Sequence, residues 1–306
     1  MAVFPDHGRS PDALLRSADL AMYKAKENGK NRFEFFSASL AQRSERRAGI
    51  KTALKLALQR DALALYYQPR VAVVDGRLVG AEALLRWTDS RLGAIGPKEF
   101  INIAEESGLI HELGLFVFRK ACKQIRLWQD RGVPIGRISI NFSAHQLLVA
   151  TFIDEVDLVI EETGCDPRLV EVEITETSML FDLGVTKNVI ADLKHRGMHI
   201  AIDDFGTGFS SLSHLQQLDI DTLKIDQSFI RDMLDDAGDL AITRSVISLG
   251  RGLGLTVTAE GVENDRQLQA LRDAGCDHYQ GFLFSPAVAA EDLEVLYQDN
   301  LARALH

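Results

Sequence analysis

The sequence MHIAIDDFGTGFSSL, residues 198–212, decides how the rest of this chain is organised. Its apolar first half predicts a buried strand that ends in two adjacent carboxylates, Asp203 and Asp204. Two carboxylates at the end of a buried strand repel each other, so a cation must compensate them or one of them must take up a proton. A divalent metal ion is one such cation. The alternative is an Asp-Asp turn that caps the next helix, which we expect to open at Ser210 or Ser211.

Composition and charge limit the class of protein. The chain has 306 residues, of which 46% are hydrophobic and 25% charged, as in an ordinary soluble globular protein of one large or two smaller domains. Its net charge of −10 provides no basic surface for a nucleic-acid polymer or an anionic membrane. No run approaches the roughly 20 apolar residues of a membrane span, although an anchor upstream of this chain stays open. The odd number of cysteines (Cys122, Cys165 and Cys276), without a CxxC pair or a signal peptide, predicts reduced thiols in a cytoplasmic protein.

From residue 63 onward, predicted strands alternate with predicted helices. The first two strands, 63–69 and 77–86, are joined by a turn at Asp75-Gly76, which indicates an antiparallel start. Six further strands are expected at 138–141, 170–174, 199–203, 222–225, 256–258 and 276–282. The expected helices are 97–106, 109–131, 151–162, 183–196, 210–215, 239–253 and 265–274. This order predicts an α/β fold, a TIM-type (β/α)8 barrel with an antiparallel first strand. A doubly wound open sheet is the alternative, but no glycine-rich dinucleotide fingerprint supports it.

Polar residues end or interrupt these strands, on the side that forms the mouth of a TIM barrel. They are Glu82, Asn141, Glu173, Asp203, Asp204, Lys224, Glu260 and Gln280. Carboxylate and amide oxygens are hard ligands that suit Mg²⁺ or Mn²⁺. Two such ions about 3.5–4 Å apart are the usual arrangement for displacement at a phosphodiester, so we expect two per site. Lys224 near these acids would stay charged and would orient a water or stabilise charge on phosphate. Alternatively, it is only a structural ion-pair partner.

Several motifs carry a resemblance to a known family. In chain order they are YYQP (66–69), EALLRW (82–87), INFS (140–143), EITE (173–176), DDFGTGFSSL (203–212), LKIDQSFI (223–230), TAEGVE (258–263) and QGFLFS (280–285). Over roughly residues 45–290 the chain therefore resembles the EAL family of cyclic di-GMP phosphodiesterases. Phe209 and Phe282 depart from the pattern of that family, in which tyrosine is common at both positions.

The resemblance implies a role for each matching residue. The principal metal ligands would be Glu82, Asn141, Glu173 and Asp203, with Asp204 serving the second metal. Lys224 and Glu260 would position the nucleophilic water and help to deprotonate it. Substrate would be bound by Gln68, Leu84, Arg86 and Gln280, with Arg86 on the phosphate because guanidinium suits bidentate contacts. Glu176 would brace the DDFGTG loop without binding metal.

The function implied by the resemblance is metal-dependent hydrolysis of cyclic di-GMP to linear pGpG in bacterial second-messenger signalling. The family also implies a homodimer paired near the DDFGTG loop. A catalytically idle receptor for cyclic di-GMP is an alternative, which predicts missing ligands, and none is missing. A different metal-dependent barrel enzyme, acting on sugars or enolates, would leave the placement of Lys224 and Arg86 unexplained.

The first 40 residues have a different pattern. A helix opening at Pro11 and stopping at Asn28-Gly29 and a short strand at 32–36 are expected there. A polar, Arg-rich segment at 37–47 follows and leads into a linker helix that includes Ile50 and Leu54. One helix and one strand cannot bury their apolar faces alone. The sequence ADLAMYKAKENGKNRFEFF (18–36) resembles the last helix and strand of a GGDEF (diguanylate cyclase) domain, without its catalytic signature. We therefore expect residues 1–40 to be the remnant of such a domain plus linker, residues 41–306 to be the EAL domain, and the GGDEF and sensor regions to lie upstream.

Overall fold

A computed structural model describes residues 1–27, 29, 31–179, 182–208 and 215–304 of the chain. It divides into two compact units, of which the smaller comprises residues 1–62 and 87–109, and the larger residues 63–86 and 110–306. The helix expected at 210–215 and the departure at Phe209 fall on or next to residues 209–214, which lie outside the described residues.

The larger unit is built on a closed barrel of eight strands. Around the barrel the order is β1-β9-β8-β7-β6-β5-β4-β2, and β2 pairs with β1 to close it. Their bounds are β1 (Ala64–Ala72), β2 (Leu78–Asp89), β4 (Arg137–Asn141), β5 (Val170–Thr175), β6 (His199–Phe205), β7 (Thr222–Ile225), β8 (Thr256–Ala259) and β9 (His278–Tyr279). Strand β1 is antiparallel to both of its neighbours, and all the other neighbours in the barrel are parallel. The predicted TIM-type barrel with an antiparallel first strand is confirmed, and the open sheet is wrong.

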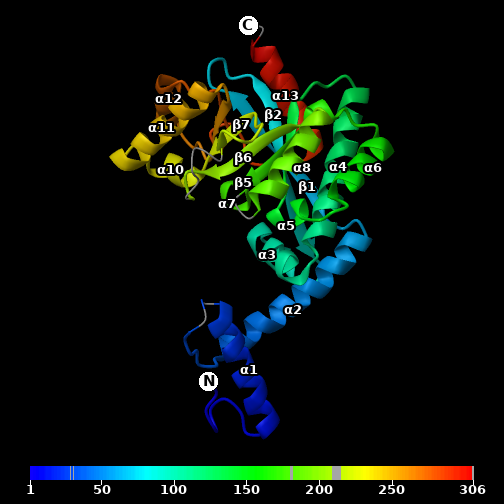
Figure 1. The fold of residues 1–306 in the computed structure, drawn as a ribbon, viewed down its shortest axis with the longest axis vertical. Helices are drawn as coiled ribbons and strands as arrows, with labels where there is room; N and C mark the ends of the chain where they lie inside the picture. Colours follow the sequence, from blue (N-terminus) through cyan, green and yellow to red (C-terminus); the bar gives the residue numbers. More distant parts are fainter. Residues whose placement is uncertain (28, 30, 180–181, 209–214, 305–306) are drawn as a thin grey trace. The chain divides into compact units, whose positions relative to one another are not determined.

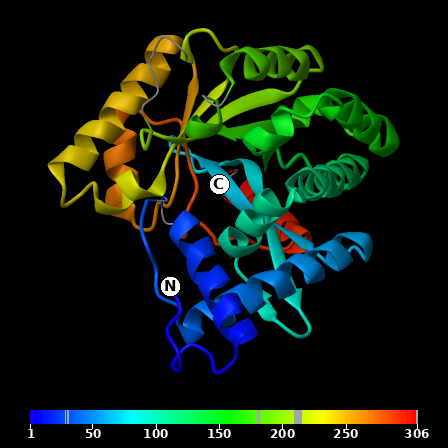
Figure 2. The ribbon, with the colours of Figure 1, turned by 60° about the horizontal axis from the view of Figure 1, so that its bottom comes forward.

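Helices surround the strands. They are α4 (Ile110–Asp130), α5 (Ala144–Leu147), α6 (Phe152–Thr163), η1 (Pro167–Leu169), α7 (Glu176–Met179), α8 (Leu183–His195), α10 (Gln227–Asp232), α11 (Ala237–Leu253), α12 (Asp265–Ala274) and α13 (Ala290–Ala304). Figures 1 and 2 show α4, α6, α8, α11 and α12 on the outside of the barrel. The apolar core fills the space between these helices and the outward faces of the strands, where the Phe142 ring packs edge-on against Phe152 and at a tilt against Phe118.

Local sequence signals set the helix ends. Helix α12 begins after Asn264, whose side chain accepts from the Gln267 amide at 3.0 Å while the Gln267 side chain accepts from the Asn264 amide at 3.2 Å. This reciprocal capping satisfies backbone donors that the first turn leaves free. The helix ends at Gly275, whose φ of 77° is left-handed. The expected bounds of this helix, 265–274, are therefore those observed.

Strand β6 continues past the predicted end at Asp203. It runs to Phe205, with a register shift against β7 between Ile202 and Phe205 and a φ of 54° at Asp204. The expectation that the strand stops at Asp203 is wrong because a bulge absorbs the extra residue and lets pairing resume. Aspartate tolerates this left-handed conformation better than most residues.

The smaller unit contains α1 (Pro11–Glu27), α2 (Ala38–Gln59), the short strand β3 (Gly93–Ile95) and α3 (Pro97–Ser107). The strand expected at 32–36 does not form, because none of the strands in the described part of the chain pairs with it; the Phe36 amide instead donates to the Met1 carbonyl at 2.9 Å. Helix α2 already begins after Ser37, whose side chain caps it. The predicted boundary at residue 40 falls inside α2 and stays a prediction.

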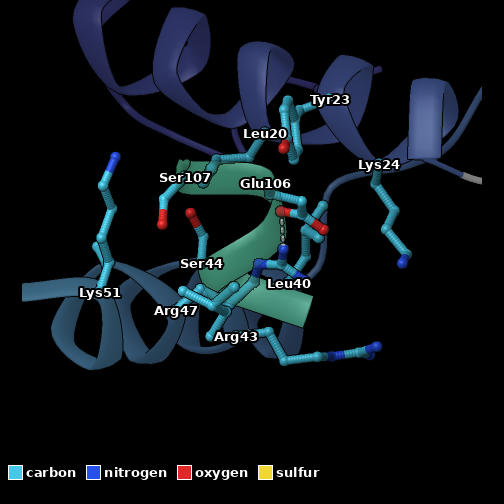
Figure 3. A pocket seen from close by; sticks show the side chains of 12 residues that line it. Leu20, Tyr23, Lys24, Leu40, Arg43, Ser44, Arg47, Lys51, Glu106 and Ser107 are labelled. Carbon is cyan, nitrogen blue, oxygen red and sulfur yellow. Dashed lines mark hydrogen bonds and ion pairs between the residues drawn. The ribbon is translucent and has the colours of Figure 1, made fainter. Parts of the chain in front are cut away.

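A hollow of about 330 Å³ lies between α1, α2 and α3. Figure 3 shows Leu20 and Leu40 beside the ion pair of Arg47 with Glu106. Within the part of the chain that the structure describes, no helix is both long and apolar enough to cross a membrane.

Candidate active site

The ammonium group of Lys224 on β7 lies at the centre of four carboxylates. Its Nζ is 2.6 Å from Glu260, 2.8 Å from Glu173, and 3.3 Å from both Glu82 and Asp203. The Lys224 side chain is 0% exposed, so water does not screen these contacts. One positive charge therefore faces four potential negative charges in a buried cluster.

Two amides complete the cluster. Asn141 donates through Nδ2 to Glu82 at 2.7 Å. Gln280 donates through Nε2 to Glu82 at 2.7 Å and to Glu260 at 2.9 Å. The predicted residues at the strand ends thus meet at one mouth because the carboxyl ends of the parallel strands converge there.

Three carboxylates at this mouth have raised pKa values although Lys224 is nearby, whereas the pKa of Glu82 is lowered. Burial and the nearby Glu82 raise the pKa of Glu173 well above its usual value. Burial likewise raises the pKa of Glu260 to about 8, despite Lys224. Burial and Asp203 together raise the pKa of Asp204 to about 6. The pKa of Lys224 is itself raised well above its usual value, because the acids outweigh burial, so the ammonium stays charged. Without a further cation, some of the acids must hold protons.

The residues present fit a hard divalent cation. The Oε1 atom of Glu173 is buried without a hydrogen-bond partner among the described residues. Asp203, Asp204 and Glu260 each offer one oxygen, and these oxygens lie within 4.8 Å of one another. Such oxygen donors, with excess negative charge, are what Mg²⁺ or Mn²⁺ binds.

The loop after β6 is tied to Glu176 at the start of α7. The Glu176 Oε2 atom accepts from the Gly206 amide at 2.9 Å and from the Gly208 amide at 3.3 Å. A Cβ atom on Gly208 would lie 2.8 Å from Glu176 Oε1, so a larger residue at this position would displace the carboxylate. These are the contacts that the predicted bracing role needs.

The three other predicted substrate residues lie on β1 and β2. Gln68 is paired with Glu82 across the two strands, and Leu84 and Arg86 follow at alternate positions on the same face of β2. Arg86 donates to the Leu85 carbonyl at 3.0 Å. No hydrogen bond or ion pair described here joins Gln68, Leu84 or Arg86 to the acidic cluster, so their substrate role stays a prediction.

Sequence reasoning missed three polar residues in the barrel. After burial and Asp203, the negative charge of the nearby Asp226 helps to raise the Asp204 pKa. Arg70 and Glu171 form a buried ion pair. The signal for Glu171 was present in VEVEIT, because residues at alternate positions of a strand share a face and Glu171 is two positions before Glu173.

Together the fold and the site define an eight-stranded (β/α)8 barrel with an acidic mouth that fits divalent metal. The sequence matches the EAL domain family over residues 51–287, and the chain belongs to this family. Family membership accounts for the joint appearance of the EALLRW, DDFGTG and LKID motifs, which lie on β2, β6 and β7.

Curated relatives and solved structures agree with this assignment. The bifunctional diguanylate cyclase/cyclic di-GMP phosphodiesterase MucR of Pseudomonas aeruginosa is 38% identical over 96% of this chain and 43% of its own length. The cyclic di-GMP phosphodiesterase PdeR of Escherichia coli is 36% identical over 99% of this chain and 46% of its own length. This chain thus spans less than half the length of these two relatives. The structure of the PaMucR phosphodiesterase in complex with c-di-GMP is 39% identical, with a TM-score of 0.77 over 80% of this chain and 99% of that one.

Proposed function

We propose that this chain is a cyclic di-GMP phosphodiesterase that hydrolyses one phosphodiester bond of cyclic di-GMP to give linear pGpG, as part of second-messenger signalling. The observation that carries the proposal is the buried cluster around Lys224, in which four carboxylates exceed the one available cation. The similarity to relatives named for this activity, and to a phosphodiesterase solved with c-di-GMP, supports the choice of substrate.

The proposal includes a requirement for Mg²⁺ or Mn²⁺, with two ions per site. Glu82, Asn141, Glu173 and Asp203 would hold one ion, and Asp203 with Asp204 the second. When bound, such ions polarise the phosphoryl oxygens and lower the pKa of water. Two observations support this assignment: the Glu173 Oε1 atom has no hydrogen-bond partner within the described part of the chain, and oxygens of Asp203, Asp204 and Glu260 lie close together.

The chain's own residues would handle the water and the substrate. The Lys224 Nζ atom lies 2.6 Å from Glu260 Oε1. We infer that these two residues position the attacking water and help to remove its proton. In the reaction the water oxygen bonds to phosphorus, the bond from phosphorus to the 3′ oxygen breaks, and that oxygen takes a proton. Gln68, Leu84, Arg86 and Gln280 would bind the dinucleotide, with Arg86 on a phosphate. Glu176 would hold the loop at Gly206 and Gly208 in place.

The direct test is conversion of cyclic di-GMP to pGpG by the purified chain with Mg²⁺, followed by chromatography. The same assay is run on Glu82→Gln, which keeps the shape of the side chain but removes its charge. Glu161→Gln makes the same change at an exposed position and serves as the control. We expect turnover in the wild type and in Glu161→Gln, and a loss of at least about 100-fold in Glu82→Gln, because a metal ligand is weakened.

Two outcomes would contradict the proposal. Tight binding of cyclic di-GMP without turnover would make the chain a receptor. Neither binding nor turnover would favour a barrel enzyme with another substrate.

Two further proposals concern the assembly. We propose that residues 1–40 are the end of a GGDEF-like domain whose remaining part, with a sensor region, precedes this chain in a longer protein. We also propose that the EAL domain pairs as a homodimer. Multi-angle light scattering at micromolar concentration tests the second proposal: a mass near twice 33.9 kDa supports it, and a mass near 33.9 kDa contradicts it.

A further inference from the structure

A second cavity opens at the amino ends of the barrel strands, at the opposite end of the strands from the acidic cluster. Its volume is about 380 Å³. The lining includes the first residues of four strands, Arg137 of β4, Thr222 of β7, Thr256 of β8 and His278 of β9. Nothing in the proposed phosphodiesterase reaction uses this end of the barrel.

The lining also includes the buried guanidinium of Arg70, whose side chain is only 5% exposed. Its Nη1 atom donates to Ser139 at 3.2 Å and to Glu171. Its Nε atom is buried and has no hydrogen-bond partner among the described residues. The Nδ1 atom of His278 is also buried without such a partner. Two buried nitrogens at one cavity thus lack partners, and buried polar groups rarely stay unpaired.

The carboxylates around the cavity are already engaged. Glu171 accepts from Ser139 at 2.7 Å and from Thr222 at 3.0 Å, in addition to Arg70. Arg168 at the rim is paired with Asp166 at 2.7 Å. Arg137, which is exposed at the rim, makes no ion pair with any described residue. The lining therefore has a surplus of positive charge from Arg137.

We propose that this cavity binds a phosphate group, between Arg137 at the rim and the guanidinium of Arg70 and the imidazole of His278 within. Guanidinium groups match the geometry of phosphate oxygens, and a dianion uses the surplus charge. In the tautomer that carries hydrogen on Nδ1, His278 donates to the same anion. The phosphate group could come from inorganic phosphate or from the end of a nucleoside monophosphate, and the test separates these sources.

The test is calorimetric titration of the Mg²⁺-loaded chain, first with inorganic phosphate and then with GMP. Because Arg70→Met would leave Glu171 buried and unpaired, the variant used is Arg137→Gln at the exposed rim. Arg126→Gln on α4 removes the same charge from an exposed residue elsewhere and is the matched control. Glu82→Gln serves to detect binding at the acidic mouth.

We expect one saturable phosphate site that is weakened about tenfold by Arg137→Gln and left unchanged by Arg126→Gln and Glu82→Gln. Equal dependence on Arg137 for GMP would identify the terminal phosphate as the ligand, and binding of phosphate alone would identify the free ion. No saturable binding, an equal loss in Arg126→Gln, or a loss only in Glu82→Gln would overturn the proposal. The readout is binding alone, so failure here would leave the proposed hydrolysis of cyclic di-GMP untouched.

Discussion

At the residue scale, Lys224 is the group on which the acidic cluster depends. A lysine inside an apolar strand would normally lose its charge, but four carboxylates within 3.3 Å keep it protonated. Removing one partner from a buried ionic cluster costs far more than removing a surface ion pair, since the remaining charges have no compensation. Lys224 therefore contributes to stability as well as to chemistry.

We expect Lys224→Met to destabilise the metal-free chain by about 3 kcal/mol, because the uncompensated acids must bind protons or repel one another. This corresponds to a fall in Tm of roughly 6–12 °C. Added Mg²⁺ should recover part of the loss, since it replaces the missing positive charge. Calorimetric melting with and without Mg²⁺ checks this, with Lys187→Met on the exposed face of α8 as control. Equal Tm values for the two variants would show that Lys224 does not stabilise the folded chain in this way.

Gly208 is a second residue at which a substitution should affect activity. In Gly208→Ala the new Cβ atom would lie 2.8 Å from Glu176 Oε1 and would displace that carboxylate. We expect phosphodiesterase activity to fall about 10- to 100-fold with little change in Tm, because the loop beside Asp203 and Asp204 moves while the barrel does not. Activity and melting are measured on the same preparation.

Gly252→Ala supplies the control for this change. Gly252 lies in α11 with nothing within 4 Å of its added Cβ, so alanine there should stabilise the chain by up to about 1 kcal/mol and leave activity unchanged. If Gly208→Ala retains full activity, the contact with Glu176 does not position the site.

At the scale of elements, the hydrophobic pattern of the strands allowed the polar residues at the mouth of the barrel to be predicted. Apolar runs interrupted by single polar residues gave the ends of β4, β5 and β7, and their parallel pairing placed Asn141, Glu173 and Lys224 together. The same period in VEVEIT should also have indicated Glu171. Its partner Arg70 comes from the antiparallel β1, about 100 residues away along the chain.

Features set by a partner strand could not be predicted. The bulge at Asp204 depends on how β6 pairs with β7, which no pattern within β6 contains. The strand expected at 32–36 has suitable residues but no partner strand among the described residues. The local sequence pattern thus predicted a strand correctly where that strand finds a partner in the fold. It failed where the pairing with another strand determines whether a strand forms or where it ends.

His278 on strand β9 should make the stability of the folded chain depend on pH. Burial and the nearby Arg70 lower the pKa of His278 to about 4 from an ordinary 6.5. The unfolded chain therefore binds this proton first as pH falls, so the folded state loses stability between about pH 6.5 and 4 and none above that range. We expect His278→Gln to lose about 1–2 kcal/mol less stability than the wild type between pH 7 and pH 5. Urea unfolding at both pH values measures this, with the exposed His195→Gln as control. Parallel losses in the wild type and His278→Gln would contradict the expectation.

At the scale of the whole molecule, stability and metal binding should be linked. The chain carries a net charge of −10, and the carboxylates buried at the mouth have Lys224 as their shared ion-pair partner, which compensates only one charge. A ligand that binds the folded barrel and not the unfolded chain adds RT ln(1 + [L]/Kd), about 2.7 kcal/mol at one hundred times Kd. We expect Mg²⁺ or Mn²⁺ to raise the Tm by several degrees and EDTA to reverse this, because the ions relieve repulsion that protons otherwise relieve.

The rise in Tm supports the proposed metal site only if the stabilising ion binds at the mouth of the barrel. Glu173→Gln should abolish the rise in Tm with Mg²⁺, since Glu173 is 0% exposed and its Oε1 atom has no partner among the described residues. Glu161→Gln should keep it. The rise should also grow between pH 6 and pH 8, because the pKa values of Asp204, about 6, and Glu260, about 8, mean that protons compete with the metal at the lower pH. An equal rise in Glu173→Gln and the wild type would place the stabilising ion elsewhere on the acidic surface and would remove the mouth of the barrel as the metal centre.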